Sequence, residues 1–134
     1  MLQLGLTHTS VLKVEDAHTA ANIGSGDMNV LATPIMMALM ENAAMLAVDQ
    51  ELPEGQTTVG AFIKSTHQKP SPIGAEIIAT AQLVNIDGNQ LDFHVVAMQM
   101  PNEEEQQAGK KPVIIGEGEH TRYIVDRDRF LAKL

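Results

Sequence analysis

A carboxylate inside an apolar segment is the first residue of this sequence that could do chemistry. Residues 30–48 read VLATPIMMALMENAAMLAV, and Glu41 is the one ionisable side chain among them. An ionised carboxylate buried without a partner is costly, so Glu41 needs either a partner or a chemical role. The structural alternatives are a buried ion pair and a helix side that emerges at an interface.

Thr33 is the second candidate, because it precedes Glu41 by eight residues in the same segment. That spacing is roughly two helical turns, about 12 Å of rise, so the side chains can border one cleft but cannot touch within the helix. A ligand or a second subunit must bring them together. Alternatively, Thr33 acts only as a helix cap that accepts hydrogen bonds from the first turn, with Pro34 at the first helical position.

His67 is the third candidate, at the end of a strand-like segment, residues 57–66. Side chains alternate between the two faces of a strand, so His67 should point toward the core. The same face would hold Val59, Ala61 and Ile63. An imidazole in this position can act as an acid or a base, or it can be a hydrogen-bonded core residue.

The other histidines are weaker candidates, and their spacing does not indicate a metal site. They are His8, His18, His94 and His120.

Composition narrows the classes of function. The 134 residues are 44% hydrophobic, which suits one domain spanning residues 1–134. A net charge of −8 argues against nucleic acid as a partner. The chain has no cysteine, and its start, MLQLG, lacks a signal-peptide pattern, so we expect a cytoplasmic protein. The apolar segment after Thr33 is short for a membrane span and contains Glu41, which indicates a core helix.

These candidates must be positioned by one long helix and a set of strands. Pro34 to about Asp49 is predicted to be a helix that is apolar on nearly every side and therefore surrounded by other structure. Strand patterns cover residues 10–16, 57–66, 75–86, 91–100 and 112–125. Residues 87–89, DGN, predict a tight hairpin turn, and residues 101–111 predict a solvated loop. This order predicts an α+β domain whose mostly antiparallel sheet wraps one central helix, with dimerisation expected.

Three segments together resemble a known family. They are LATPIMMALMENAA (31–44), TVGAFIKSTHQKPSPIG (58–74) and GEGEHTR (116–122). In their order, and in the agreement of strand and helix positions, they are similar to the fluoroacetyl-CoA thioesterase-like group of hotdog-fold proteins. The resemblance implies a homodimer, with pairing into tetramers left open, whose sheets join edge to edge and whose acyl-CoA site lies between protomers.

The resemblance also implies roles for individual residues. Thr33, Glu41 and His67 match the family's Thr, Glu and His. Gly60 matches a glycine whose backbone lies beside the acyl group, and Arg122 matches an arginine near the site. No cofactor is implied, because coenzyme A enters as part of the substrate. Residues 26–32, GDMNVLA, contain no Phe where the fluoroacetyl enzyme looks aromatic-rich, so an aromatic gate for fluorine is not expected.

Two main hypotheses follow. In the first, an acyl-CoA thioesterase, Glu41 is the nucleophile or general base, His67 exchanges protons, and Thr33 with nearby helix N–H groups polarises the carbonyl. The second is a non-catalytic hotdog dimer that binds acyl-CoA or another apolar small molecule; a third option is a purely structural dimer. Because coenzyme A is anionic, a thioesterase needs a local basic rim. Its candidates are Lys64, Lys69, Lys110, Lys111 and Arg122.

Overall fold

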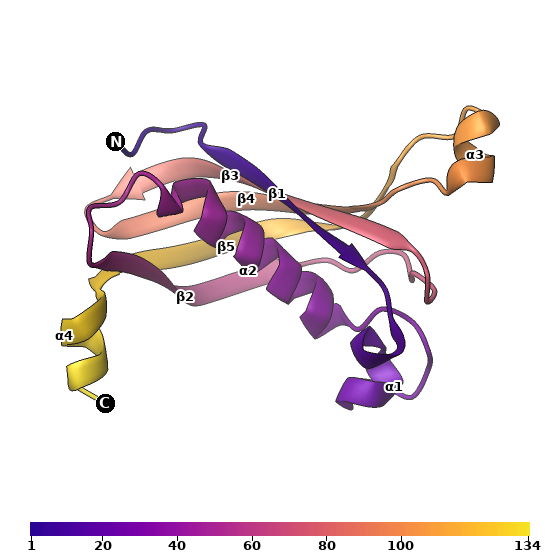
Figure 1. Cartoon of the computed structure of the whole chain (residues 1–134), viewed down its shortest axis with the longest axis horizontal. Helices are drawn as coiled ribbons and strands as arrows, with labels where there is room; N and C mark the ends of the chain where they lie inside the picture. Colours follow the sequence, from indigo (N-terminus) through magenta and orange to yellow (C-terminus); the bar gives the residue numbers. More distant parts are fainter.

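A long helix, α2 (Thr33–Asp49), lies across one face of a five-stranded antiparallel sheet in the computed structural model, which describes residues 1–134 (Figure 1). The strand order is β1-β3-β4-β5-β2, so β1 and β2 form the two edges. The strands are β1 (Thr7–Lys13), β2 (Gln56–Ser65), β3 (Glu76–Asp87), β4 (Gln90–Gln99) and β5 (Val113–Asp126). The predicted α+β architecture, an antiparallel sheet around one helix, is confirmed.

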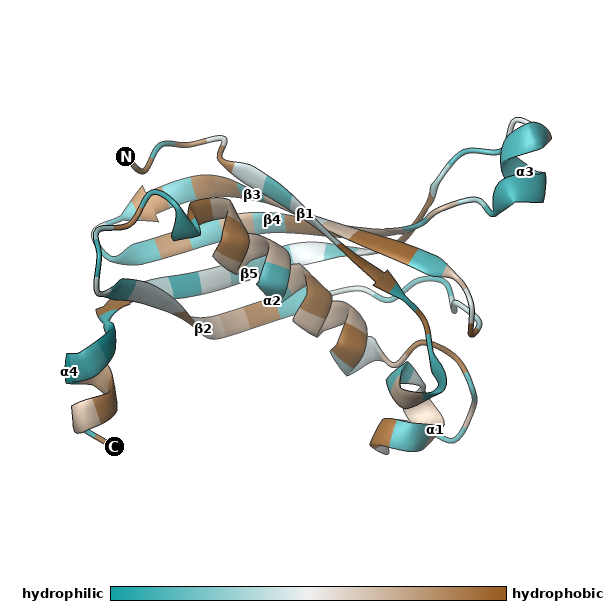
Figure 2. Ribbon diagram, viewed as in Figure 1, coloured by the Kyte–Doolittle hydropathy of each residue, from teal (hydrophilic) through white to brown (hydrophobic).

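The core lies between α2 and the central strands, and small residues allow the helix to come close to the sheet. The helix buries Met36, Met40, Ala43, Ala44, Ala47 and Val48. Alternate residues of β3 and β4 face it, which are Ile77, Ala79, Ala81, Leu83, Leu91, Phe93, Val95 and Ala97. Figure 2 shows apolar residues along α2 and along the strands behind it.

The opposite side of α2 is not covered by this chain. Pro34, Ala38, Asn42 and Leu46 are exposed, and they recur at helical spacing along one side. The prediction that the helix would be surrounded is therefore wrong for a single chain. None of the helices is long and apolar enough to cross a membrane.

The first strand begins and ends three residues earlier than predicted. The chain leaves the sheet after Lys13, and Asp16–His18 form a 3-10 helix, η1, closed by reciprocal hydrogen bonds between Glu15 and His18. This local capping box competes with strand pairing at residues 14–16. A short helix, α1 (Ala20–Ile23), follows.

Two short helices complete the chain. The segment predicted as a solvated loop contains α3 (Glu103–Gln107), whose first turn is capped by Asn102 and Glu105. The sequence reading missed α4 (Arg127–Ala132), which begins after β5 with Asp126 as its cap. Both are too short to show helical periodicity, so their caps were the available signal.

A bulge in β2 changes which residues face the helix. Val59 pairs with Tyr123 and Ile63 pairs with His120, and the register shifts between Gly60 and Phe62. The extra residue reverses the alternation. Ile63 therefore shares the inner face with buried His120, whereas Val59 lies on the outer face. The prediction that positions 59, 61 and 63 share one face is wrong.

Candidate active site

Thr33 and His67 meet at the beginning of α2. Thr33 Oγ1 lies 2.7 Å from His67 Nδ1. The predicted capping role of Thr33 is wrong, because Ala32 is the N-cap and no side chain caps this helix. Backbone bonds from Leu31 N to Ser71 O and from Ala32 N to His18 O fix the segment before the helix. The helix thus begins one residue earlier than predicted, which leaves the Thr33 hydroxyl free to contact the imidazole.

The backbone on both sides of His67 is tied to β5. Thr66 N donates to Glu117 O over 3.0 Å, and Gln68 N donates to Ile115 O over 2.6 Å. These bonds continue the pairing of β2 with β5 beyond the end of the strand. His67 therefore has a fixed place above the start of α2, although it lies outside regular secondary structure.

Two glycines of the GEGEHTR segment make this close crossing possible. A Cβ atom on Gly118 would lie 1.8 Å from Lys64 O. A Cβ atom on Gly116 would lie 2.5 Å from Thr66 O and 2.8 Å from the sulfur of Met36. Real Cβ atoms do not approach backbone oxygens this closely, so both positions require glycine. The segment thus shapes the strand that carries His67.

The His67 imidazole is half-buried and has one free nitrogen. Nε2 is buried and has no hydrogen-bond partner. Burial lowers the pKa of His67 from its usual value of 6.5, and the nearby backbone of Lys69 partly opposes this shift. The ring is therefore held as a neutral base near pH 7. A cavity of about 240 Å³ opens beside it, lined by Ala20, Ser25, Val30, Leu31, Thr33, His67 and Pro70.

Glu41 forms a second cluster, with Gly60 and Arg122, farther along α2. A Cβ atom on Gly60 would lie 2.9 Å from Glu41 Oε2 and 3.4 Å from Arg122 Nη1. The missing side chain at position 60 is therefore what lets the carboxylate lie against β2. Glu41 is half-buried and makes no hydrogen bond or salt bridge in this chain. The structure does not bring it into contact with Thr33 or His67.

Arg122 is buried and tightly held from two strands. Its Nε donates to Thr58 Oγ1 over 2.7 Å, and its Nη2 donates to Thr58 O over 3.0 Å. Burial lowers the pKa of Arg122, and the negative charge of Glu41 opposes that shift. A side chain that is 7% exposed cannot belong to a surface rim. The prediction that Arg122 is part of the basic rim is therefore wrong. The four lysines predicted for that rim, Lys64, Lys69, Lys110 and Lys111, are exposed.

His120 is the residue of this cluster that sequence reasoning ranked too low. It is 1% exposed, and its Nε2 lies 3.2 Å from Arg122 Nη1. One signal could have found it: His120 and Arg122 are two residues apart on a strand and so share a face.

Residues 14–128 match the family described as fluoroacetyl-CoA-specific thioesterase. The chain belongs to this family, a family of thioester hydrolases. A fluoroacetyl-CoA thioesterase from Streptantibioticus cattleyicolor is 31% identical over 105 residues, which cover 78% of this chain and 68% of that protein.

Solved structures agree with this assignment. A fluoroacetyl-CoA thioesterase structure is 26% identical with a TM-score of 0.83, over 99% of this chain and 95% of that one. A hot-dog-like protein from Thermanaerovibrio acidaminovorans is 22% identical with a TM-score of 0.79, over 97% and 88% of the two chains. The latter shows the fold alone, and the predicted hotdog fold is confirmed.

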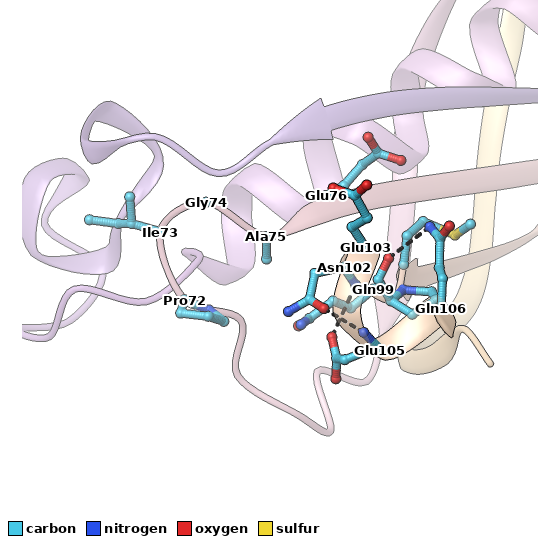
Figure 3. A pocket seen from close by; sticks show the side chains of 12 residues that line it. Pro72, Ile73, Gly74, Ala75, Glu76, Gln99, Asn102, Glu103, Glu105 and Gln106 are labelled. Atoms are coloured by element: carbon cyan, nitrogen blue, oxygen red, sulfur yellow. Dashed lines mark hydrogen bonds between the residues drawn. The ribbon is translucent and has the colours of Figure 1, made fainter. Parts of the chain in front are cut away.

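This member of the fluoroacetyl-CoA-specific thioesterase family has a larger cavity elsewhere, of about 480 Å³, between the 72–76 segment and the start of α3 (Figure 3). Its acidic lining residues are Glu76, Glu103 and Glu105. None of Thr33, Glu41 and His67 lines it. An acidic lining opposes the binding of anions, so we place the candidate site at the two clusters on α2 instead.

Proposed function

We propose that this protein hydrolyses a small or medium acyl-CoA thioester at a site between two protomers of a homodimer. Thr33 and His67 of one protomer would face Glu41 of the partner subunit. The observation that carries the proposal is the Thr33–His67 pair, 2.7 Å apart, in a member of a thioester hydrolase family. Gly60 and Arg122 would border the acyl group beside Glu41.

Two unsatisfied groups support the site between protomers. The buried Nε2 of His67 lacks a partner, and the carboxylate of Glu41 lacks one too. Buried polar groups are almost always hydrogen-bonded, so Nε2 of His67 needs a partner from outside the single chain. The half-buried carboxylate of Glu41 is free to contact such a partner. A second subunit or the substrate can supply both.

The edge strand β2 supports the dimer. It pairs with β5 on one side and has no neighbour on the other. An exposed strand edge presents free N–H and C=O groups that readily pair with a second copy. Two-fold antiparallel pairing would lay the His67 end of one β2 alongside the earlier part of the other, toward Gly60. The exposed side of α2 would then face the new interface.

Each residue then has a chemical task. The Thr33 hydroxyl and the first N–H groups of α2 would hold the thioester carbonyl and stabilise its developing negative charge. Glu41 would act as general base on water or as nucleophile on the carbonyl carbon. His67, neutral in the resting site, would take up and release protons. In sum the carbon–sulfur bond breaks, water supplies the hydroxyl of the acid, and its remaining proton ends on the thiol.

The segment before α2 bears on the acyl group. It contains no aromatic residue, and Met28 is 66% exposed. A relative acts on fluoroacetyl-CoA, but we propose no preference for fluorine here, because no aromatic ring stands where a gate would be needed. The exposed lysines 64, 69, 110 and 111 are our candidates for contacts with the phosphates of coenzyme A. Tetramer formation and a cytoplasmic location stay predictions.

Thiol release from a panel of acyl-CoAs tests the proposal with wild type, Glu41→Gln and His67→Ala. We expect each variant to lose at least about 100-fold in kcat, because general acid–base groups contribute that much or more. Glu119→Gln, an exposed carboxylate on β5, is the matched control and should hydrolyse like wild type.

Full activity in both site variants would contradict the assigned roles. Saturable acyl-CoA binding without turnover in wild type would instead favour the alternative, a non-catalytic hotdog dimer that binds acyl-CoA. The adaptable Met-rich core, with eight methionines in the chain, favours that alternative as a binding protein. A change in dimer stability alone would indicate a structural dimer.

A further inference from the structure

His120 is buried in the Glu41 cluster with both ring nitrogens engaged. Nδ1 lies 2.7 Å from the Phe62 carbonyl oxygen, and Nε2 lies 3.2 Å from Arg122 Nη1. A carbonyl can only accept, so Nδ1 must carry the hydrogen. A guanidinium can only donate, so Nε2 must offer its lone pair. The contacts therefore define one protonation state of His120: neutral, with the hydrogen on Nδ1.

This neutral ring supplies the last hydrogen-bond acceptor for the Arg122 guanidinium. Thr58 accepts from Nε and Nη2, and His120 accepts from Nη1. Acceptors at all three nitrogens fix both the plane and the direction of the group. The fixed direction brings Nη1 to the empty side of Gly60, where Glu41 Oε2 also lies.

The second contact of His120 reaches the bulge of β2. Phe62 follows the extra residue Ala61, and its carbonyl accepts from Nδ1. The bulge separates the inner-facing Gly60 from the inner-facing Ile63. The His120 imidazole thus contacts both the β2 bulge beside Gly60 and the Arg122 guanidinium that faces Glu41.

We propose that His120 is a positioning residue of the thioesterase site, which holds Arg122 toward Glu41 and fixes the β2 bulge while its ring is neutral. The proposal rests on the thioesterase function proposed above. His120 itself would not touch the substrate.

Protonation of His120 would undo this arrangement. A proton on Nε2 removes the acceptor of Arg122 and places two positive charges side by side. Arg122 of β5 opposes protonation and Glu41 of α2 favours it, while β2 offers the Phe62 carbonyl and β4 offers the apolar ring of Phe93. Burial is the largest influence and lowers the pKa of His120 from 6.5. The hydrogen bond between Arg122 and His120 should therefore persist at pH 7 and break only in more acidic solution.

Kinetics of His120→Gln and His120→Leu test the role. The Gln oxygen can stand near the position of Nε2 and accept from Arg122 without titrating, whereas Leu offers no acceptor. We expect His120→Leu to lose at least about tenfold in kcat with a smaller change in KM, because misplaced groups slow chemistry. His120→Gln should recover most of that loss and weaken the fall of kcat in acid. Phe93→Leu, which packs on the same ring, controls for stability and should change the melting temperature more than kcat.

A second measurement does not depend on turnover. Ring-nitrogen NMR of the wild-type protein should show neutral His120 with its hydrogen on Nδ1 at pH 7. Finding the hydrogen on Nε2, or wild-type kcat in His120→Leu, would overturn the proposal. Absence of hydrolysis by wild type would instead remove the thioesterase function, and the NMR result would still decide whether His120 holds Arg122.

Discussion

At the scale of single residues, the site depends on a hydroxyl group that contacts an imidazole and does not cap the helix. Thr33 stands where a helix cap is expected, yet its Oγ1 contacts His67 Nδ1 while Ala32 holds the cap position. The hydroxyl is therefore available to the site and contributes no capping bond to α2. If Thr33 were a cap, its substitution would lower mainly the stability. If its hydroxyl is catalytic, its substitution will lower mainly kcat.

Replacing Thr33 by Val keeps the shape of the side chain and removes its hydroxyl. We expect kcat to fall roughly 100-fold, the usual cost of losing one donor to a developing oxyanion. The unfolding free energy should change by less than about 0.5 kcal/mol, since loss of a true cap costs about 1 kcal/mol. Thr33→Ser should keep most of the activity. Urea unfolding together with thiol-release kinetics checks both effects, and a stability loss with normal kcat would return Thr33 to a capping role.

The two histidines of the clusters make stability depend on pH. Burial lowers the pKa of His67 and of His120 below 6.5, so between these folded values and 6.5 the unfolded chain binds more protons than the folded one. Stability rises with pH where the unfolded state holds more protons. The histidine contribution is thus complete above pH 6.5 and is lost as the pH falls through the lowered values.

The midpoint of urea unfolding should therefore decrease steadily as the pH is lowered from about 7 to about 5. The double variant His67→Gln with His120→Gln should show a shallower decrease, because its two side chains do not titrate. His8→Gln is a matched control, as His8 lies on β1 away from both clusters. Equal slopes in wild type and the double variant would show that these histidines keep ordinary pKa values in the fold.

The sequence revealed some of these residues better than others. Glu41 could be found because it breaks an apolar pattern, and His67 because it lies at the end of a strand-like segment. The partner of Thr33 could not, since the local signal of Thr33-Pro34 indicates a cap, whereas the contact to His67 spans 34 residues of chain. His120 was ranked low because its burial depends on pairing with β2, and its spacing from Arg122 shows only that the two share a face.

At the scale of elements, the strand that carries Gly60 and His67 is shaped by a bulge and by glycines of its neighbour. Long segments with strong patterns, such as α2 and the β3–β4 hairpin, were predicted close to their observed bounds. The bulge was not, because one extra residue in β2 changes no hydropathy pattern but reverses the faces that follow. Short α3 and α4 are marked in the sequence only by their capping residues and were missed for that reason.

Gly118→Ala should damage the site through this strand. Its Cβ would lie 1.8 Å from Lys64 O, so the end of β2 must move away from β5 and carry His67 with it. We expect a loss of about 1–3 kcal/mol in unfolding free energy, typical of overpacking, and a fall in kcat. Glu119→Ala, the neighbouring exposed position on the same strand, should change stability by less than about 0.5 kcal/mol. Thermal unfolding of both variants makes the comparison, and equal stability would contradict the close crossing.

At the scale of the whole molecule, one chain presents two separate parts of a site and an open edge of its sheet at β2. The Thr33–His67 pair and the Glu41–Arg122 cluster lie at different places along the same helix and do not meet. A second copy would cover the exposed side of α2 and pair with the open edge of β2.

Mixing two inactive variants should restore activity if each site draws on both protomers. In a heterodimer of Glu41→Gln with His67→Ala, one site would combine the intact His67 of the first chain with the intact Glu41 of the second. Random exchange of equal amounts makes about half of all dimers heterodimers with one good site of two, so kcat per chain should approach about a quarter of wild type. Thiol release measured before and after subunit exchange checks this. A mixture of two Glu41→Gln preparations is the control and should stay inactive. If the mixed variants also stay inactive although mass spectrometry shows that heterodimers have formed, each site lies within one chain, and Glu41 must reach His67 through the substrate alone.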